Sequence, residues 1–254
     1  MAILDPKAMR FYINGYDGSG SIPTLGTWGV SYDTNPQAAL SDEIKSIVKG
    51  FGAFQAGPVN TFLAPGISND LHALFSAGDY FNISAIFGTT GGPVIGDPMV
   101  AMTMEQGAYN ATPGEGFFGA NIAFPTASPR GSLAHSACWG NLVHPKGAET
   151  AANTAVTTFD DRGAATTNGG LFVYHLFSSD GTVTLSLDDS ATNANNAAFA
   201  ALSGATSGSI DASVTPKSGI IALSNTATIR RYVRWQIALG TATTCLFSCS
   251  LIRG

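Results

Sequence analysis

The sequence predicts an all-β protein: a β-sandwich or barrel with one flanking α-helix, and a second small β-sandwich-like lobe at the C-terminus. Three observations lead to this fold class. Short segments rich in β-branched and aromatic residues recur along the chain. Turn-forming residues, including 30 glycines, separate them. Helical apolar spacing is confined to two segments, and a chain of 254 residues corresponds to one large all-β domain or two modest ones.

The first elements are an arm and two strands. Residues 1–10 predict an irregular arm, because Pro6 blocks regular structure. Residues 11–15 predict a strand that ends in a tight turn over 15–21, where glycine and aspartate supply the positive-φ positions. Residues 27–32 alternate between apolar and polar side chains and predict a second strand.

Residues 41–51 predict the flanking helix. Ser41 is a suitable N-cap, and the acidic residues that follow it favour the positive end of the helix dipole. Glycines 50 and 52 offer a C-terminal stop. The apolar residues at positions i, i+3, i+4 and i+7 form one stripe: Ile44, Ile47, Val48 and Phe51. A shorter helix is a candidate at residues 68–75.

The rest of the chain predicts short strands and one change of composition. Ala, Thr, Asn and Gly dominate residues 145–170, which indicates a linker or long loop. We therefore expect a β domain over 1–150, a linker over 151–170 and a β-rich lobe over 171–254. Residues 193–209 are small and polar and predict an exposed excursion. The expected strands are 80–87, 99–104, 119–124, 171–177, 182–187, 229–239 and 244–252.

The charge balance excludes several classes of protein. Charged residues make up 11% of the chain, too few for a disordered segment, and no apolar run is long enough for a membrane helix. Residues 1–150 contain 6 basic and 11 acidic residues, a net charge of −5, while residues 151–254 contain 6 of each. This acidity argues against a protein that binds nucleic acid by neutralising phosphates. So low a charge is typical of a surface that partners cover.

Residue types that often form catalytic or metal-binding sites are present, but their spacing along the sequence does not fit such a site. His135, Cys138 and His144 lack the fourth ligand of a structural zinc site. Cys245 and Cys249 lie too far apart along one strand to pair, so they are expected in the core. Acidic turns explain Asp180, Asp188 and Asp189 better than a calcium site does. We expect no enzyme activity, no cofactor and no metal.

Three cysteines do not form a disulfide framework, and the first residues lack the features of a signal peptide. We therefore expect synthesis in a reducing cytoplasm, without export by the general route. Arg230, Arg231 and Arg234 form the one basic cluster. A strand face that meets acidic groups of a neighbouring subunit explains them at least as well as nucleic-acid binding does.

Two stretches, read together, resemble the major tail tube protein of a long-tailed bacteriophage. The first is the strand and turn over 11–20, followed by the expected helix over 42–50 and by Gly96-Asp97-Pro98. The second runs from 171–177 through the Arg-Tyr-Val-Arg-Trp strand to residues 246–254. The long loop at 145–170 and the excursion at 193–209 depart from that pattern.

The resemblance implies a structural virion protein whose hexameric rings stack into a tube, an acidic conduit for DNA ejection. It implies partnership with itself and with other tail proteins, passage of genomic DNA without specific binding, no membrane contact, and assembly in the bacterial cytoplasm. The acidic N-terminal part would line the lumen, with these candidates: Asp33, Asp79, Glu105 and Glu115. The three arginines are the candidates for contacts between subunits.

A second reading is a β-sandwich binding or head-decoration module of the virion. In that case exposed aromatic residues would stack on sugars, and the candidates are Trp28, Trp139 and Trp235. Core positions in a β fold are the simpler explanation for these tryptophans.

Overall fold

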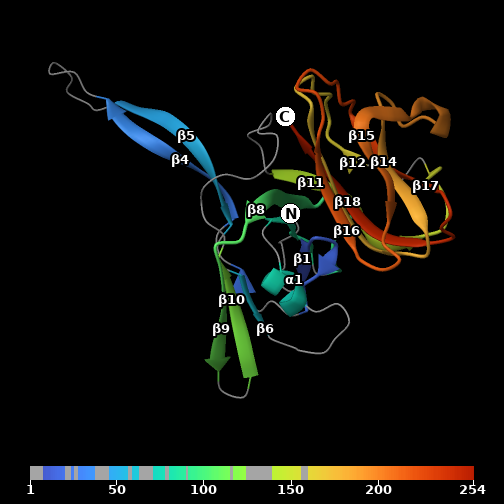
Figure 1. Ribbon diagram of the computed structural model, residues 1–254. Helices are drawn as coiled ribbons and strands as arrows, with labels where there is room; N and C mark the ends of the chain where they lie inside the picture. Colours follow the sequence, from blue (N-terminus) through green and yellow to red (C-terminus); the bar gives the residue numbers. More distant parts are fainter. Residues whose placement is uncertain are drawn as a thin grey trace.

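In the part of the chain that the structure describes, the protein is nearly all β, as the sequence predicts, with one short α-helix (Figure 1). The computed structural model describes residues 8–20, 24–25, 28–37, 46–56, 59–62, 71–77, 80–89, 91–114, 117–123, 139–155 and 160–254. Within these residues the strands form four sheets.

The largest sheet has eight strands and takes them from both halves of the chain. Its spatial order is β16 (Lys217–Ala222), β13 (Gly170–Ser179), β18 (Cys245–Arg253), β11 (Trp139–Glu149), β8 (Pro98–Glu105), β7 (Tyr80–Ile86), β1 (Arg10–Ile13) and β2 (Tyr16–Asp17). The pairs are antiparallel throughout. The sheet therefore joins strands from both sides of the expected linker.

Two smaller sheets flank it. The C-terminal one has the order β12 (Asp160–Asp161), β17 (Tyr232–Leu239), β14 (Thr182–Ser190) and β15 (Ala200–Asp211). The N-terminal one has the order β3 (Thr24–Leu25), β6 (Val59–Phe62), β10 (Phe117–Ala123) and β9 (Ala108–Gly114). The helices of the described part are α1 (Leu71–Ala77) and the 3₁₀ turn η2 (Asn196–Ala198).

The main core lies between β13 and β18 of the large sheet and β14 and β17 of the C-terminal sheet. The sequence explains this packing, because β14 alternates strictly and buries Val183, Leu185 and Leu187 on one face. Strand β13 is buried on both faces and is nearly continuously apolar, since Phe172 faces this core while Val173 faces another. A separate core lies beneath β1, β7 and β8, and Phe75 of α1 packs into it.

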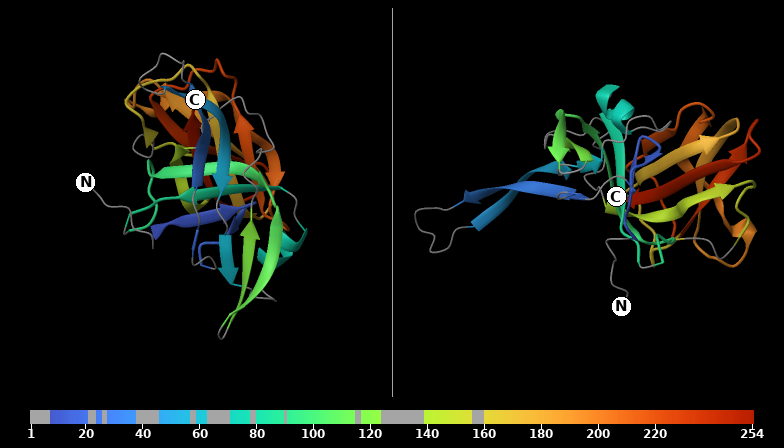
Figure 2. Two further views of the ribbon diagram at one scale, coloured as in Figure 1. Left: turned by 90° about the vertical axis from the view of Figure 1, so that its left-hand side faces the viewer. Right: turned by 90° about the horizontal axis from the view of Figure 1, so that it is seen from below.

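The fourth sheet is a two-stranded hairpin, β4 (Trp28–Gln37) and β5 (Ser46–Ala56). Within the described residues these strands pair only with each other. The hairpin extends away from the rest of the molecule in Figure 1 and in the right-hand view of Figure 2. From here on, the arm means this hairpin, residues 28–37 and 46–56, and not the irregular N-terminal segment expected over 1–10.

The arm overturns one expectation. The helix expected over 41–51 does not form over 46–51, because these residues belong to strand β5. Residues 41–45 lie outside the described part. The register places Val48 opposite Asn35 and Ile47 opposite Pro36, so pairing with β4 replaces the local helical bonds. The shorter helix expected over 68–75 is confirmed as α1, from Leu71 to Ala77.

The strands expected in the C-terminal part are confirmed in β13, β14, β17 and β18. Residues 193–209 are mostly exposed, as expected, and from Ala200 onward they belong to edge strand β15. Its alternating small residues pair with β14. The division into residues 1–150, 151–170 and 171–254 stays a prediction.

Candidate functional site

The arginine cluster lies on and beside strand β17, and its three members have different surroundings. Arg231 makes two hydrogen bonds to the Asp161 carboxylate, at 2.7 and 2.8 Å, and its side chain is 42% exposed. The Arg231 guanidinium holds the pKa of Asp161 at about 2. Arg230 is similarly exposed, and its Nε lies 3.7 Å from Asp189. Both arginines therefore reach the surface.

Arg234, in contrast, is only 3% exposed. Its guanidinium donates to Asp188 Oδ2 at 3.0 Å and to Asn196 Oδ1 at 2.6 Å, and it lies over the Phe199 ring. Gln236 donates to the same Asp188 oxygen at 2.9 Å. This buried network ties β17 to β14 and to η2 within one chain. The expected role of Arg230, Arg231 and Arg234 between subunits stays a prediction.

The acidic residues expected to line a lumen are only partly described. Glu105 is the exposed last residue of β8. Asp33 lies in β4 at a register shift between Tyr32 and Thr34, so it belongs to another sheet than Glu105. Asp79 and Glu115 lie outside the described residues. Their common face stays a prediction.

The arm carries an unusual sequence for a projecting hairpin. Its strands contain one acidic residue, Asp33, and one basic residue, Lys49. Their apolar residues are Trp28, Val30, Tyr32, Ile47, Val48, Phe51 and Phe54, with alanines besides. A two-stranded hairpin alone is at best marginally stable in water, and a protein–protein interface is depleted of charge at its centre. The arm therefore has the composition of a surface that is covered by another molecule.

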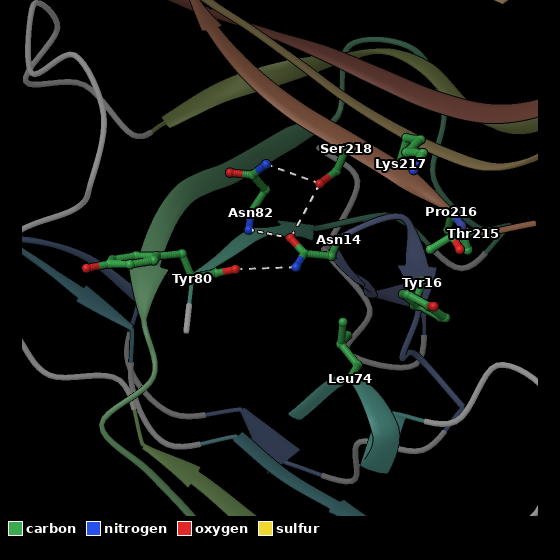
Figure 3. Close-up of a pocket in the computed structure, with 9 residues that line it drawn as sticks. All are labelled: Asn14, Tyr16, Leu74, Tyr80, Asn82, Thr215, Pro216, Lys217 and Ser218. Atoms are coloured by element: carbon green, nitrogen blue, oxygen red, sulfur yellow. Dashed lines mark hydrogen bonds between the residues drawn. The ribbon is translucent and has the colours of Figure 1, made fainter. Parts of the chain in front are cut away.

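The two edge strands of the eight-stranded sheet, β2 and β16, approach each other and leave a cavity of about 380 Å³ (Figure 3). We call this place the seam. Ser218 Oγ of β16 lies 3.1 Å from Asn82 Nδ2 and 3.4 Å from Asn14 Oδ1. A Cβ atom on Gly15 would lie 2.7 Å from the Lys217 carbonyl oxygen, so the β1–β2 turn packs directly on β16. Side chains, rather than a strand ladder, join the two edges.

A buried serine–histidine pair lies behind the seam. Its two residues are 91 positions apart, so their spacing in the sequence does not predict that they meet. Ser84 Oγ lies 2.8 Å from His175 Nε2, and the Gly15 N–H donates to His175 Nδ1 at 3.3 Å. A catalytic histidine would instead donate from Nδ1 to an orienting acceptor. Burial lowers the pKa of His175 to about 3, which makes it a weak base, and both side chains are almost fully buried. The pair is an internal hydrogen bond between β7 and β13.

The other residues considered for chemistry take structural positions. Cys245 and Cys249 are free and buried in β18, as expected, and burial raises the pKa of Cys245 to about 11. His144 stacks on Phe247 and bonds Glu149 at 3.0 Å, while His135 and Cys138 lie outside the described residues. In the described part of the chain, His, Cys, Asp and Glu form no group of three that could hold a metal ion.

The tryptophans divide between core and surface. Trp235 is 6% exposed and packs in the main core. Trp139 is 50% exposed and stacks on Phe87, with ring centroids 5.7 Å apart. The side chain of Trp28 lies outside the described part. In this part no helix is long and apolar enough to reach across a membrane.

No protein-family model matches the chain, and neither does any curated protein. Solved structures give remote similarities. The Dit protein (gp 19.1) of phage SPP1, described as a paradigm of the hub adsorption apparatus in phages that infect Gram-positive bacteria, has a TM-score of 0.32 at 11% identity, over 96% of this chain and 99% of that one. The phage P2 baseplate in its activated conformation has TM-scores of 0.35 with Ca and 0.36 with Sr, each at 8% identity over 95% of this chain and 97% of that one. TM-scores this low do not establish a shared fold.

Proposed function

We propose that the protein is a structural subunit of a long-tailed phage tail, and that its copies assemble into hexameric rings that stack into a tube. The observation that carries this proposal is the arm. Its 10- and 11-residue strands pair only with each other in the described structure and contain almost no charge. Packing against a neighbouring subunit would supply the second layer that such a hairpin lacks.

Two further features support assembly rather than catalysis. Ser84 and His175, which lie within hydrogen-bond distance of each other, are both buried inside the fold. The acidic excess of the chain falls within residues 1–150, the part that includes the arm and β8. An acidic channel wall would repel DNA and leave it free to move.

The test is an arm-shortened variant of the full chain. Tyr32 and Gly52 are opposite each other in the register, so residues 33–51 can be replaced by Asn-Gly, a two-residue hairpin turn. We expect the purified wild-type chain to form rings or tubes in negative-stain electron microscopy across a concentration series. The variant should stay monomeric by analytical ultracentrifugation and keep its far-UV circular dichroism spectrum and cooperative unfolding.

An Asn193→Ser variant, in an exposed loop far along the chain, serves as the control and should assemble like the wild type. A wild-type chain that stays monomeric at every concentration would contradict the proposal. Rings formed equally well by the arm-shortened variant would show that the arm is not the contact.

A further inference from the structure

We propose that the seam cavity binds a neutral saccharide, one or two sugar rings in size. Its volume of about 380 Å³ falls within the range of roughly 300–1,000 Å³ that is common for small-molecule sites. Among the nine described residues that line it, Lys217 is the one that carries a charge. The backbone of Lys217 lies against Gly15, so this residue contributes main chain at the point of closest approach.

The polar wall of the cavity is held in a fixed arrangement. The Asn14 carboxamide oxygen accepts from the Asn82 backbone N–H at 2.8 Å and faces Ser218 Oγ at 3.4 Å. Asn82 Oδ1 accepts from Thr103 Oγ1 at 2.7 Å, which fixes the other carboxamide. A carboxamide nitrogen carries two N–H donors, and each asparagine uses one in the bonds found here. Ser218 Oγ accepts from Asn82 Nδ2 and donates to Asn14 Oδ1, which leaves one of its two lone pairs. Two oriented amide donors and this one hydroxyl acceptor therefore remain for a ligand.

The opposite wall is apolar. Leu74 comes from α1, Pro216 from the loop before β16, and Tyr16 from β2 (Figure 3). Leu74 and Tyr16 also pack on the core beneath β1 and β7, which limits their movement. A sugar ring likewise has apolar and polar surfaces, because its C–H faces are apolar and its edge carries hydroxyl groups. The ring can lie on the Tyr16 and Leu74 wall while its hydroxyls meet the amide wall.

The backbone keeps this arrangement ready before a ligand arrives. Asn14 has φ of 47° and Gly15 has φ of 84°, so the β1–β2 turn takes a shape that few residues allow. The Gly15 N–H is anchored on buried His175. A preformed site loses little entropy on binding. None of the described residues that line the cavity belongs to the arm, and all of them come from one chain, so we expect a single copy to bind the ligand.

The experiment is a titration of the full-length protein followed by ¹H–¹⁵N NMR, with chemical shifts assigned, at a concentration where analytical ultracentrifugation shows the chain to be monomeric. The probes are methyl glucoside, methyl galactoside, methyl mannoside and N-acetylglucosamine, together with glucose 6-phosphate. We expect at least one neutral sugar to give saturable shifts, with a dissociation constant on the order of 1 mM, at residues 14–16, 74 and 215–218. Ser218→Ala should weaken binding about fivefold to tenfold, because it removes one hydrogen bond.

Tyr16→Ala should abolish detectable binding, and Tyr16→Phe should keep most of it. Thr192→Ala, in an exposed loop outside the cavity, should bind as the wild type does. Absence of saturable shifts with all the neutral sugars, or equal binding by Ser218→Ala, would overturn the proposal. Glucose 6-phosphate binding more than tenfold tighter than the neutral sugars would overturn the neutral class. These measurements stand even if Tyr16→Ala does not fold, because the wild-type shifts and Ser218→Ala suffice.

Discussion

At the scale of single residues, Arg234 and Arg231 are held by carboxylates that lie far from them along the chain. The strand expected over 229–239 is confirmed from Tyr232 to Leu239, so Arg234 lies in it and Arg230 and Arg231 lie just before it. Their partners could not be predicted, because Asp188 lies 46 residues before Arg234 and Asp161 lies 70 residues before Arg231. Which carboxylate meets which arginine depends on the register between strands, and that register depends on the whole core.

The buried imidazole of His175 makes the stability of the protein depend on pH. Its pKa is about 3 in the fold and 6.5 in a model peptide, so the unfolded chain binds one more proton between these values. The free energy of unfolding should therefore fall as the pH drops below 6.5, by up to about 1.4 kcal/mol per pH unit for this residue. Above pH 6.5 His175 contributes no pH dependence.

Urea unfolding of the wild type and His175→Asn between pH 4 and 7 measures this contribution. Asparagine offers the Gly15 N–H an acceptor close to the position of Nδ1 but does not titrate. We expect the free energy of unfolding to change less steeply with pH in the variant. The difference in slope corresponds to the uptake of about one proton, or up to about 1.4 kcal/mol per pH unit. The same slope in both proteins would mean that His175 is not held neutral.

At the scale of elements, the β4–β5 hairpin shows where local pattern fails. The apolar spacing from Ile44 to Phe51 fits a helix, yet Val48 and Ile47 are β-branched and glycines 50 and 52 disfavour a helix interior. The strand expected over 27–32 is confirmed from Trp28 onward in β4, whereas its partner β5 falls where a helix is expected. The pairing of two strands separated by a loop cannot be read from either strand alone. The seam cannot be predicted from the sequence for the same reason, since it joins residues about 200 positions apart.

The β1–β2 turn tests how much the seam contributes to stability. Gly15→Ala places a Cβ 2.7 Å from the Lys217 carbonyl oxygen and forces a non-glycine residue to φ of 84°. We expect the free energy of unfolding to fall by about 1–3 kcal/mol, measured by chemical denaturation. Gly91→Ala is the matched control, because nothing lies within 4 Å of its Cβ position, and its effect should stay within about 0.5 kcal/mol. Equal effects of the two substitutions would contradict close packing at the seam.

At the scale of the whole molecule, the all-β class with a short helix is confirmed, whereas the way the two halves join was not foreseen. Composition marked residues 145–170 as a break, but β11 runs through Glu149 and pairs with β18, the last strand of the chain. A compositional change reflects solvent exposure of side chains. It does not reveal backbone pairing, which connects strands on both sides of the break.

The acidic N-terminal part leads to a prediction about the assembled particle. If Asp33, Asp79, Glu105 and Glu115 line a channel, changing all four to lysine should slow DNA ejection, because the wall would then attract phosphates. Tubes should still assemble, as electron microscopy would show. Changing Asp180 and Asp211 to lysine, in the C-terminal part, is the control. Ejection at the wild-type rate by the four-lysine particle, measured by dye-labelled DNA release, would remove these residues from the channel.

The position of β18 has a consequence for how the chain is made. Residues 245–253 form an inner strand of the eight-stranded sheet, with β13 on one side and β11 on the other. Residues 245–253 must therefore be synthesised before β18 can pair with both β11 and β13. The eight-stranded sheet cannot form one strand at a time as the chain leaves the ribosome. Contacts this distant along the chain form slowly. Only a chain synthesised at least through Arg253 can then present a closed seam, and a chain that terminates before β18 would lack the strand that unites the two halves.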